Sequence, residues 1–295
     1  MSNKVLVIGA VNIDIFVNSD APYTLEDSNL AKISLGFGGV GGNIATNCNT
    51  LGLDVSFLTV FSSDVLGNVL KSHYQNLNID ITHAKTSDTH NASMYLGIMD
   101  QNHDLFLGLN DMSLIQALDV NWITNNHNFI QEFDVIVLDN NLSVETLKHI
   151  VTAYQDKTII IDAVSAKKVS KLKPFLSSLS ILKVNQLELN ELSSKSTVEA
   201  QIQEVLQQGL KSIIVTNKEQ PVYYGTNHSI QKFIPVPVTK IVNATGAGDA
   251  FISAIAYGIC KKMELEKYIE LAMDFAKATL QVETSTMRKG EYYVR

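Results

Sequence analysis

Short apolar runs alternate with longer amphipathic segments along most of the chain. Runs rich in Val, Ile and Leu indicate β-strands, and several are continuously apolar, as is typical of strands covered on both faces. They lie at residues 5–8, 55–60, 135–138, 158–161, 181–184 and 212–216. Segments with helical spacing lie at residues 43–51, 64–77, 144–154, 198–208, 247–260 and 265–282. The alternation predicts an α/β fold of three layers, α/β/α, around a mostly parallel central sheet.

Two regions break this alternation. Residues 10–40 and 92–109 are strand-like, carry polar residues among the apolar ones and show no helical pattern. We expect them to form a small separate β-sheet that lies over the main domain as a lid, within a single domain of residues 1–295. A cover of this kind suits a reaction from which water must be excluded.

Composition and charge narrow the class of protein. With 45% hydrophobic and 18% charged residues the chain resembles an ordinary soluble protein, and no apolar run approaches the roughly 20 residues that span a bilayer. A formal charge of −7 without a Lys/Arg cluster argues against nucleic-acid binding. The first residues read as a β-strand rather than a signal peptide, and Cys48 and Cys260 lie in helical patterns. We expect a cytoplasmic protein with a small-molecule partner and no membrane association.

The most informative stretch is the loop Gly246, Ala247, Gly248, which is followed by Asp249 at the start of a predicted helix. Glycines allow close approach of a ligand, and amides at a helix N-terminus can converge on an anion. We expect Asp249 to remain ionised near neutral pH in this first turn. It could then take a proton from a hydroxyl while the amides hold a phosphoryl group. The structural alternative is a helix with an acidic first turn and a flexible entry.

Two earlier segments suit a polar ligand. Strand alternation places Asn12 and Asp14 on one face, where Asp14 could accept hydrogen bonds from a vicinal diol; the alternative is a solvated strand edge. Residues 36–42 contain five glycines, which indicates backbone packed against a ligand. Asn43 would then cap the following helix or reach into the site. The stretch after the first strand lacks the G-x-G-x-x-G fingerprint, which argues against a dinucleotide-dependent oxidoreductase.

Four motifs occur together in one order along the chain: G-x-x-N-x-D near the N-terminus, GG-x-G-x-N at a helix entry, N-x-x-E beginning at Asn185, and T-G-A-G-D-A around Asp249. In this combination the chain resembles the ribokinase/PfkB family of carbohydrate and nucleoside kinases over nearly its whole length. The resemblance implies a ribokinase-like fold, ATP as co-substrate and Mg²⁺ as cofactor.

The resemblance also implies roles for the residues at the motif positions. Asp249 would be the catalytic base, with an anion hole formed by Gly246, Ala247 and Gly248. The sugar-contacting positions would be Asp14, Gly39, Gly42 and Asn43. The nucleotide-side positions would be Asn185, Thr216, Asn243 and Thr245, with Gly246 and Gly248. Glu188 would position Mg²⁺ through water, and relatives often use a monovalent cation such as K⁺ near the anion-hole loop.

A narrower similarity is to the pseudouridine kinases within this family. Val40 replaces the lysine of a Gly-Lys pair typical of ribokinase, residues 109–112 (LNDM) resemble an N-D-M signature, and residues 162–168 (DAVSAKK) resemble D-P-V-S-x-x-K. This similarity implies phosphorylation of the 5′-hydroxyl of pseudouridine. Asn12 and Asn110 could contact the base, and Lys168 a base carbonyl or a substrate phosphate, unless it is an exposed loop lysine.

The remaining alternatives are a kinase of ribose or of a conventional nucleoside, and a non-catalytic ligand-binding homologue. Three positions depart from the family pattern: residues 217–221 where a glycine-bearing turn is usual, and Ala163 and Val184 where proline often occurs. Pro221 fixes its own φ, so we expect the nucleotide-side turn to be built differently. Relatives commonly pair through the lid, which predicts a homodimer.

Overall fold

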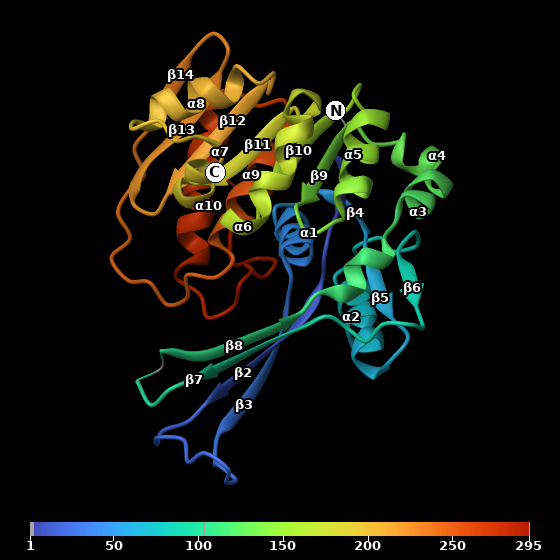
Figure 1. Cartoon of the computed structure of the whole chain (residues 1–295), viewed down its shortest axis with the longest axis vertical. Coiled ribbons are helices and arrows are strands. Elements are labelled where there is room, and N and C mark those ends of the chain that lie inside the picture. The colour runs from blue at the N-terminus through green and yellow to red at the C-terminus, as the bar shows by residue number, and fades with distance from the viewer. Residues whose placement is uncertain (1–2, 103, 295) are drawn as a thin grey trace.

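One central sheet of eight strands organises residues 3–102 and 104–294, the part of the chain that the computed structural model describes (Figure 1). The strand order is β14-β13-β12-β11-β10-β9-β1-β4. Six strands run parallel: β1 (Lys4–Ile8), β4 (Asp54–Leu58), β9 (Val135–Asp139), β10 (Thr158–Asp162), β11 (Ile181–Asn185) and β12 (Ser212–Asn217). At one edge, β13 (Gln220–Thr226) pairs antiparallel with β12, and β14 (Ile230–Phe233) pairs antiparallel with β13. This confirms the predicted α/β class with a mostly parallel central sheet.

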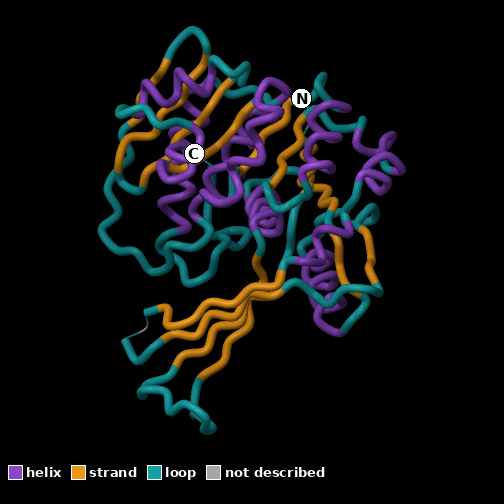
Figure 2. The backbone as a smooth tube through the Cα atoms, in the orientation of Figure 1, coloured by secondary structure: helices purple, strands orange, loops and turns teal. Residues whose placement is uncertain are grey.

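Helices cover both faces of this sheet, so the molecule has three layers (Figure 2). Along β1, Val5 and Val7 enter one core while Leu6 and Ile8 enter the other, which explains why the buried strands are continuously apolar. The first core includes α1 (Val40–Thr50), α9 (Ala247–Cys260) and α10 (Leu265–Thr279). The second includes α5 (Val144–Ala153), α7 (Gln186–Leu192) and α8 (Val198–Leu206).

The shorter elements border these layers. They are α2 (Val65–Asn76), α3 (Val120–Asn125), α4 (His127–Ile130), α6 (Ala166–Val169), two 3₁₀ segments (Ser113–Ala117 and Ser170–Ser178) and the paired strands β5 (Val60–Ser62) and β6 (Lys85–Ser87). Within the described ranges, no helix combines the length and apolar character needed to cross a membrane.

A second sheet of four strands projects from the main body, and we call it the lid (Figure 1). Its order is β3 (Lys32–Gly38), β2 (Asn12–Asn18), β7 (Met94–Met99) and β8 (Leu105–Asp111). The prediction of a separate small sheet is confirmed, and its strands lie within residues 12–38 and 94–111. The strand register aligns one residue from each strand in a single row: Gly36, Asp14, Tyr95 and Asn110. We call the side of the lid that carries this row the Asp14 face, and the other side the opposite face.

Helix α1 begins at Val40, three residues before the start that its pattern predicts. Glycine is a poor helix former, but these glycines lie where larger residues would collide. A Cβ on Gly41 would lie 2.7 Å from the backbone of Gly9, and a Cβ on Gly42 would lie 2.2 Å from the Tyr74 hydroxyl. Close packing against β1 and α2 therefore sets this helix start.

The turn that departs from the family pattern is a tight hairpin between β12 and β13. Asn217 pairs with Gln220 across it, and Lys218 adopts a left-handed conformation with φ 49°. The positive φ lets a two-residue connection reverse the chain without a glycine. Pro221 lies just inside β13.

Candidate active site

Asp249 lies in the first turn of α9, behind the loop of small residues. Gly246 precedes the helix with φ 85°, and a Cβ at that position would lie 1.9 Å from the carbonyl oxygen of Ser285. Only glycine fits both the backbone conformation and the space. The first N–H groups of a helix have no partner within it, so the amides of the loop are available as hydrogen-bond donors at the start of the helix that carries Asp249.

The environment of Asp249 corrects the expectation that it is ionised at neutral pH. Burial raises the pKa of Asp249 to about 8, and the charge of Asp162 acts in the same direction. The hydrogen bond from Asn43 and the charge of Lys183 lower the pKa and offset part of this effect. Desolvation outweighs the position at the helix N-terminus, so the carboxyl group of the free protein is largely protonated at pH 7.

Asn43 links the first turn of α1 to this carboxylate. Its Nδ2 donates to Asp249 Oδ2 at 2.8 Å, and its Oδ1 accepts from Ser285 Oγ at 3.1 Å. The suggestion that Asn43 caps the helix is wrong, because the capping position is Gly39 and Asn43 lies inside α1. Ser285, which the sequence did not single out, contacts both Gly246 and Asn43 and so braces the loop against α1.

Asp14 and Asn12, both on strand β2 of the lid, lie close to the residues just before α1. Asn12 Nδ2 donates to Asp14 Oδ1. A Cβ on Gly39 would lie 2.9 Å from Asn12 Oδ1, and one on Gly38 would lie 2.2 Å from Asp14 Oδ2. Burial raises the pKa of Asp14, and the hydrogen bond from Asn12 opposes this. A continuous set of contacts therefore runs from Asp14 through the turn before α1 to Asn43 and Asp249.

A buried cluster of charged side chains lies beside Gly248 of the loop that precedes Asp249. Lys183 Nζ forms an ion pair with Asp162 Oδ2 at 2.9 Å, with both side chains less than 10% exposed. A Cβ on Gly248 would lie 2.9 Å from the same ammonium group. Burial lowers the pKa of Lys183, but Asp162, Glu188 and Asp249 outweigh this and raise it above its usual value. The signal missed in the sequence is a lysine inside the apolar run 181–184, where a charge must be paired.

Asn185 and Glu188 form a capping box at the start of α7. Glu188 N donates to Asn185 Oδ1 at 3.0 Å, while Glu188 Oε2 and Oε1 accept from Asn185 N and Nδ2 at 2.7 and 2.9 Å. In the described part of the chain, no group of three or more His, Cys, Asp or Glu residues could hold a metal ion. Both Glu188 oxygens already accept hydrogen bonds, so this donor set fits an ion contacted through water.

The other residues predicted for the site are Thr216, Asn243, Thr245, Lys168 and Asn110. Thr216 is aligned with Asn185 on the neighbouring strand, and Asn243 accepts from the Thr245 amide at 2.9 Å in the exposed loop before α9. Lys168 donates to Asn141 Oδ1 beyond the end of β9, and Asn110 is exposed on the lid. Among the described residues, none of these five side chains hydrogen-bonds to Asp14 or Asp249.

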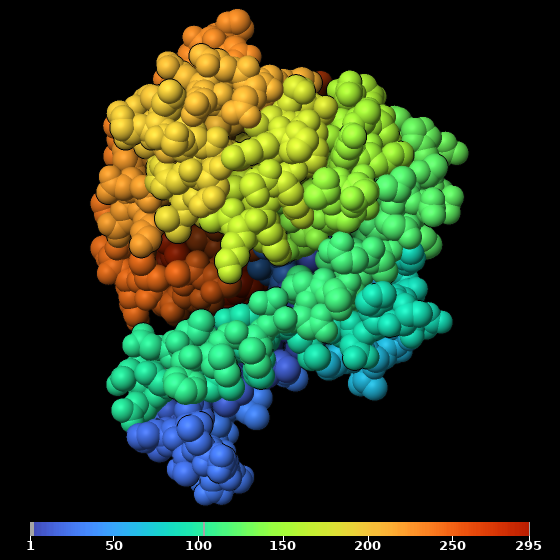
Figure 3. Space-filling model, in the orientation of Figure 1, coloured from blue at the N-terminus to red at the C-terminus, as the bar shows by residue number. Residues whose placement is uncertain are grey.

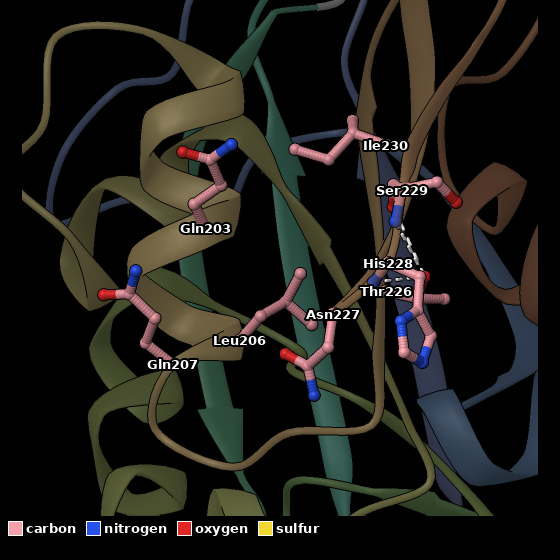
Figure 4. A pocket seen from close by; sticks show the side chains of 8 residues that line it. All are labelled: Gln203, Leu206, Gln207, Thr226, Asn227, His228, Ser229 and Ile230. Atoms are coloured by element: carbon pink, nitrogen blue, oxygen red, sulfur yellow. Dashed lines mark hydrogen bonds between the residues drawn. The ribbon is translucent and has the colours of Figure 1, made fainter.

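The surface is hollowed between the lid and the main body. Figure 3 shows this opening between the green lid strands and the yellow and orange part of the body, with blue and red segments at its floor. A second hollow lies between α8 and the β13–β14 turn (Figure 4). It is lined by Gln203, Leu206, Gln207, Thr226, Asn227, His228, Ser229 and Ile230, and includes none of the predicted site residues.

Comparison with known protein families identifies the family of this chain. The model of the pfkB family carbohydrate kinases matches residues 2–288. The chain belongs to the pfkB family. As a member of that family it is a sugar or nucleoside kinase, for which ATP and Mg²⁺ are the usual co-substrate and cofactor.

The chain is similar to two curated relatives and to one solved structure. It is 29% identical to the pseudouridine kinase of Escherichia coli over 95% of this chain and 91% of the relative. It is 25% identical to the guanosine-inosine kinase of Exiguobacterium acetylicum over 93% of each. The ribokinase of Thermotoga maritima shares the fold with a TM-score of 0.86 over 97% of each chain, at 22% identity.

Gly246 provides a first test of the loop. We expect Gly246→Ala to lower the free energy of unfolding by about 1–3 kcal/mol from backbone strain, with a further loss from the collision with Ser285. Turnover should fall at least about tenfold because the loop amides shift. Gly52→Ala is the matched control, since Gly52 has φ 89° but no atom within 4 Å of a Cβ. Urea unfolding should show a clearly larger loss for Gly246→Ala; equal losses would contradict the packing argument.

Proposed function

We propose that this protein is an ATP-dependent kinase that phosphorylates the 5′-hydroxyl of pseudouridine, with Asp249 as the general base. The observation that carries the proposal is the contact path that joins Asp249, at the loop amides, to Asp14 on the lid through Asn43. The relative that is 29% identical over 95% of the chain supports the choice of acceptor.

In the proposed reaction the 5′-oxygen attacks the γ-phosphorus of ATP in line, the bond to the β,γ-bridging oxygen breaks, and ADP leaves. The 5′-hydroxyl proton passes to Asp249. The amides of Gly246, Ala247 and Gly248 stabilise the charge on the migrating group, and the Lys183 ammonium beside Gly248 adds a positive charge. Mg²⁺, when bound near Glu188 through water, would neutralise phosphate charge.

The other predicted residues divide between the two substrates. On the acceptor side, Asp14 would hold the ribose diol, with the backbone at Gly39 and Gly42 and the side chain of Asn43 close to the sugar. Asn12 and Asn110 would contact the base, and Lys168 a base carbonyl or phosphate. On the donor side, ATP would lie along Asn185, Thr216, Asn243 and Thr245. A monovalent cation such as K⁺ would bind near the loop before α9, where Asn243 and Glu283 are joined by a hydrogen bond of 3.0 Å.

A panel of acceptors tests the proposal. ADP release should be fastest with pseudouridine when pseudouridine, uridine, guanosine, ribose and fructose 6-phosphate are compared at equal concentrations. A faster rate with ribose or a conventional nucleoside would overturn the acceptor and leave the chemistry intact. Guanosine is included because the relative from Exiguobacterium acetylicum is a guanosine-inosine kinase. No ADP with any acceptor would favour a non-catalytic ligand-binding homologue.

We also propose that the protein is a homodimer that pairs through the opposite face of the lid. Apart from Asp111, which is paired with Met94 at the end of β8, the register places apolar side chains on that face: Ile13, Ile15, Val17, Ile33, Leu35, Phe37, Met94, Leu96, Ile98, Leu107 and Leu109. Leu35 is 67% and Leu109 52% exposed, so a continuous apolar surface faces solvent in the single chain. Such a surface on a strand sheet indicates an interaction site.

Light scattering at micromolar concentration should therefore give the mass of two chains. Leu35→Lys should produce monomers, because it would place a charge in the buried centre of the pair. Leu25→Lys is the control, since Leu25 is 81% exposed and lies in the loop between β2 and β3. A wild-type monomer across this concentration range would contradict the dimer.

The compartment proposed for this kinase is the cytoplasm. Cys48 and Cys260 are both free and buried, as expected of thiols that stay reduced.

A further inference from the structure

Two aromatic side chains lie beside Asp14 on the Asp14 face of the lid. Tyr95 on β7 is aligned with Asp14 on one side and with Asn110 on the other. Phe16 is the next residue of β2 on the same face, and its ring meets that of Tyr95 edge to face, with centroids 6.1 Å apart and planes at 66°. A carboxylate, an aromatic ring and an amide therefore follow one another across three neighbouring strands.

Glycines next to these rings keep the surface open. A Cβ on Gly97 would lie 3.1 Å from Phe16 and 3.2 Å from Tyr95, and one on Gly108 would lie 3.1 Å from the Tyr95 hydroxyl. These positions align with each other across β7 and β8. Glycine is unfavourable in a strand and often marks a close approach of another group. Because Gly97 and Gly108 have no side chains, the rings of Tyr95 and Phe16 can lie against the backbone at these positions. No side chain from either glycine position covers the rings.

The spacing of this row matches a sugar that carries a planar base. Neighbouring strands lie about 4.8 Å apart, so a ribose whose diol binds Asp14 would carry its base across β7, over Tyr95 and toward Asn110. Tyr95 and Phe16 are both half-buried and so keep accessible surface. A free sugar or a sugar phosphate would leave the Tyr95 ring uncovered.

We propose that Tyr95, supported by Phe16, is the surface on which a planar base of the acceptor stacks, so that the acceptor is a nucleoside rather than a free sugar or sugar phosphate. This inference rests on the proposed function for the placement of the ribose at Asp14. Stacking on an aromatic residue contributes about 5- to 150-fold to the affinity for a base. Asn110 then fixes the edge of the base by hydrogen bonds.

The test compares Tyr95→Leu with Tyr95→Phe and with a control, Phe106→Leu. Phe106 is exposed nearer the tip of β8, where its ring contacts Tyr23. Calorimetric titration with pseudouridine and with guanosine should show the affinity of Tyr95→Leu reduced at least about fivefold for the nucleoside that the wild type binds. Tyr95→Phe and Phe106→Leu should stay within about twofold, and the KM for ATP should not change in any variant.

The possible results distinguish a base-stacking role of Tyr95 from a structural role in the lid. If the wild type binds ribose but neither nucleoside, or if Tyr95→Leu binds nucleoside as well as the wild type, the inference is wrong. A matching loss in ribose affinity or in the KM for ATP would mean that Tyr95 only supports the lid. Because titration requires no turnover, a protein that binds nucleosides through Tyr95 but releases no ADP would uphold this inference while the proposed kinase activity fails.

Discussion

Replacing Asp249 by asparagine should lower turnover at least about a hundredfold while acceptor and ATP still bind. An amide cannot take the proton from the attacking hydroxyl, but it keeps the size of the side chain and can still accept the hydrogen bond from Asn43 Nδ2. Steady-state rates of ADP release and separate binding titrations would measure the two effects. Asp274→Asn, which changes an exposed carboxylate on α10, should leave both unchanged.

The pH profile gives the same prediction an independent readout. A general base acts in its deprotonated form, and burial raises the pKa of Asp249 to about 8. The kcat/KM of the wild type, which reports the free enzyme, should therefore rise with pH, reach half of its maximum near the pKa of about 8 and level off above that pH. Asp249→Asn should lose this rise. Near-normal turnover in Asp249→Asn, or an unchanged rise with pH, would exclude Asp249 as the base.

Lys183→Met should destabilise the fold by about 3–5 kcal/mol, because it leaves the buried Asp162 carboxylate without its partner. The free energy of unfolding in urea would measure the loss. Lys183→Met combined with Asp162→Asn should recover most of it, since the remaining group is neutral. Lys32→Met is the control: its partner Asp20 lies at 3.7 Å with both side chains more than 80% exposed, and such pairs contribute about 0–1 kcal/mol. A loss below 1 kcal/mol for Lys183→Met would refute the buried pair.

The same variant should also change the pH profile if enough folded protein remains. The charge of Lys183 lowers the pKa of Asp249, so its removal should move the rise in kcat/KM to higher pH. A profile that keeps its wild-type position would show that Lys183 and Asp249 do not interact in the working enzyme.

The sequence predicted the six parallel strands of the central sheet because these strands are buried on both faces, whereas the edge strands β13 and β14 were not predicted. Residues 135–138 and 181–184, for example, form the core of β9 and β11 with boundaries within one residue. The start of α1 was missed because Gly41 and Gly42 oppose helix formation locally, and only their packing against Gly9 and Tyr74 explains the helix. The hairpin at Lys218 was missed because its positive φ has no signature in a Lys-Glu pair.

For the site, the motifs pointed to residues that the fold brings near one another, such as Asn43 and Asp249, which are 206 positions apart in sequence. The protonation of Asp249 could not be read from the sequence, because it depends on burial and on Asp162 and Lys183, whose proximity is set by tertiary packing. Ser285 was missed because its contact with Gly246 is made by a backbone carbonyl, for which the residue type gives no signal.

The covering of β1 by α9 has a consequence for how the chain is made. Val5 and Val7 lie in the core that contains α9 and α10, yet these helices are synthesised long after β1 because they follow it by more than 200 residues (Lys4–Ile8 against Ala247–Cys260 and Leu265–Thr279). At about 5–20 residues per second, translation would take on the order of ten seconds or more to travel from β1 to α9. Through that interval the nascent chain holds an apolar sheet surface without its final cover, which makes it a natural client for chaperones until α9 and α10 have been made.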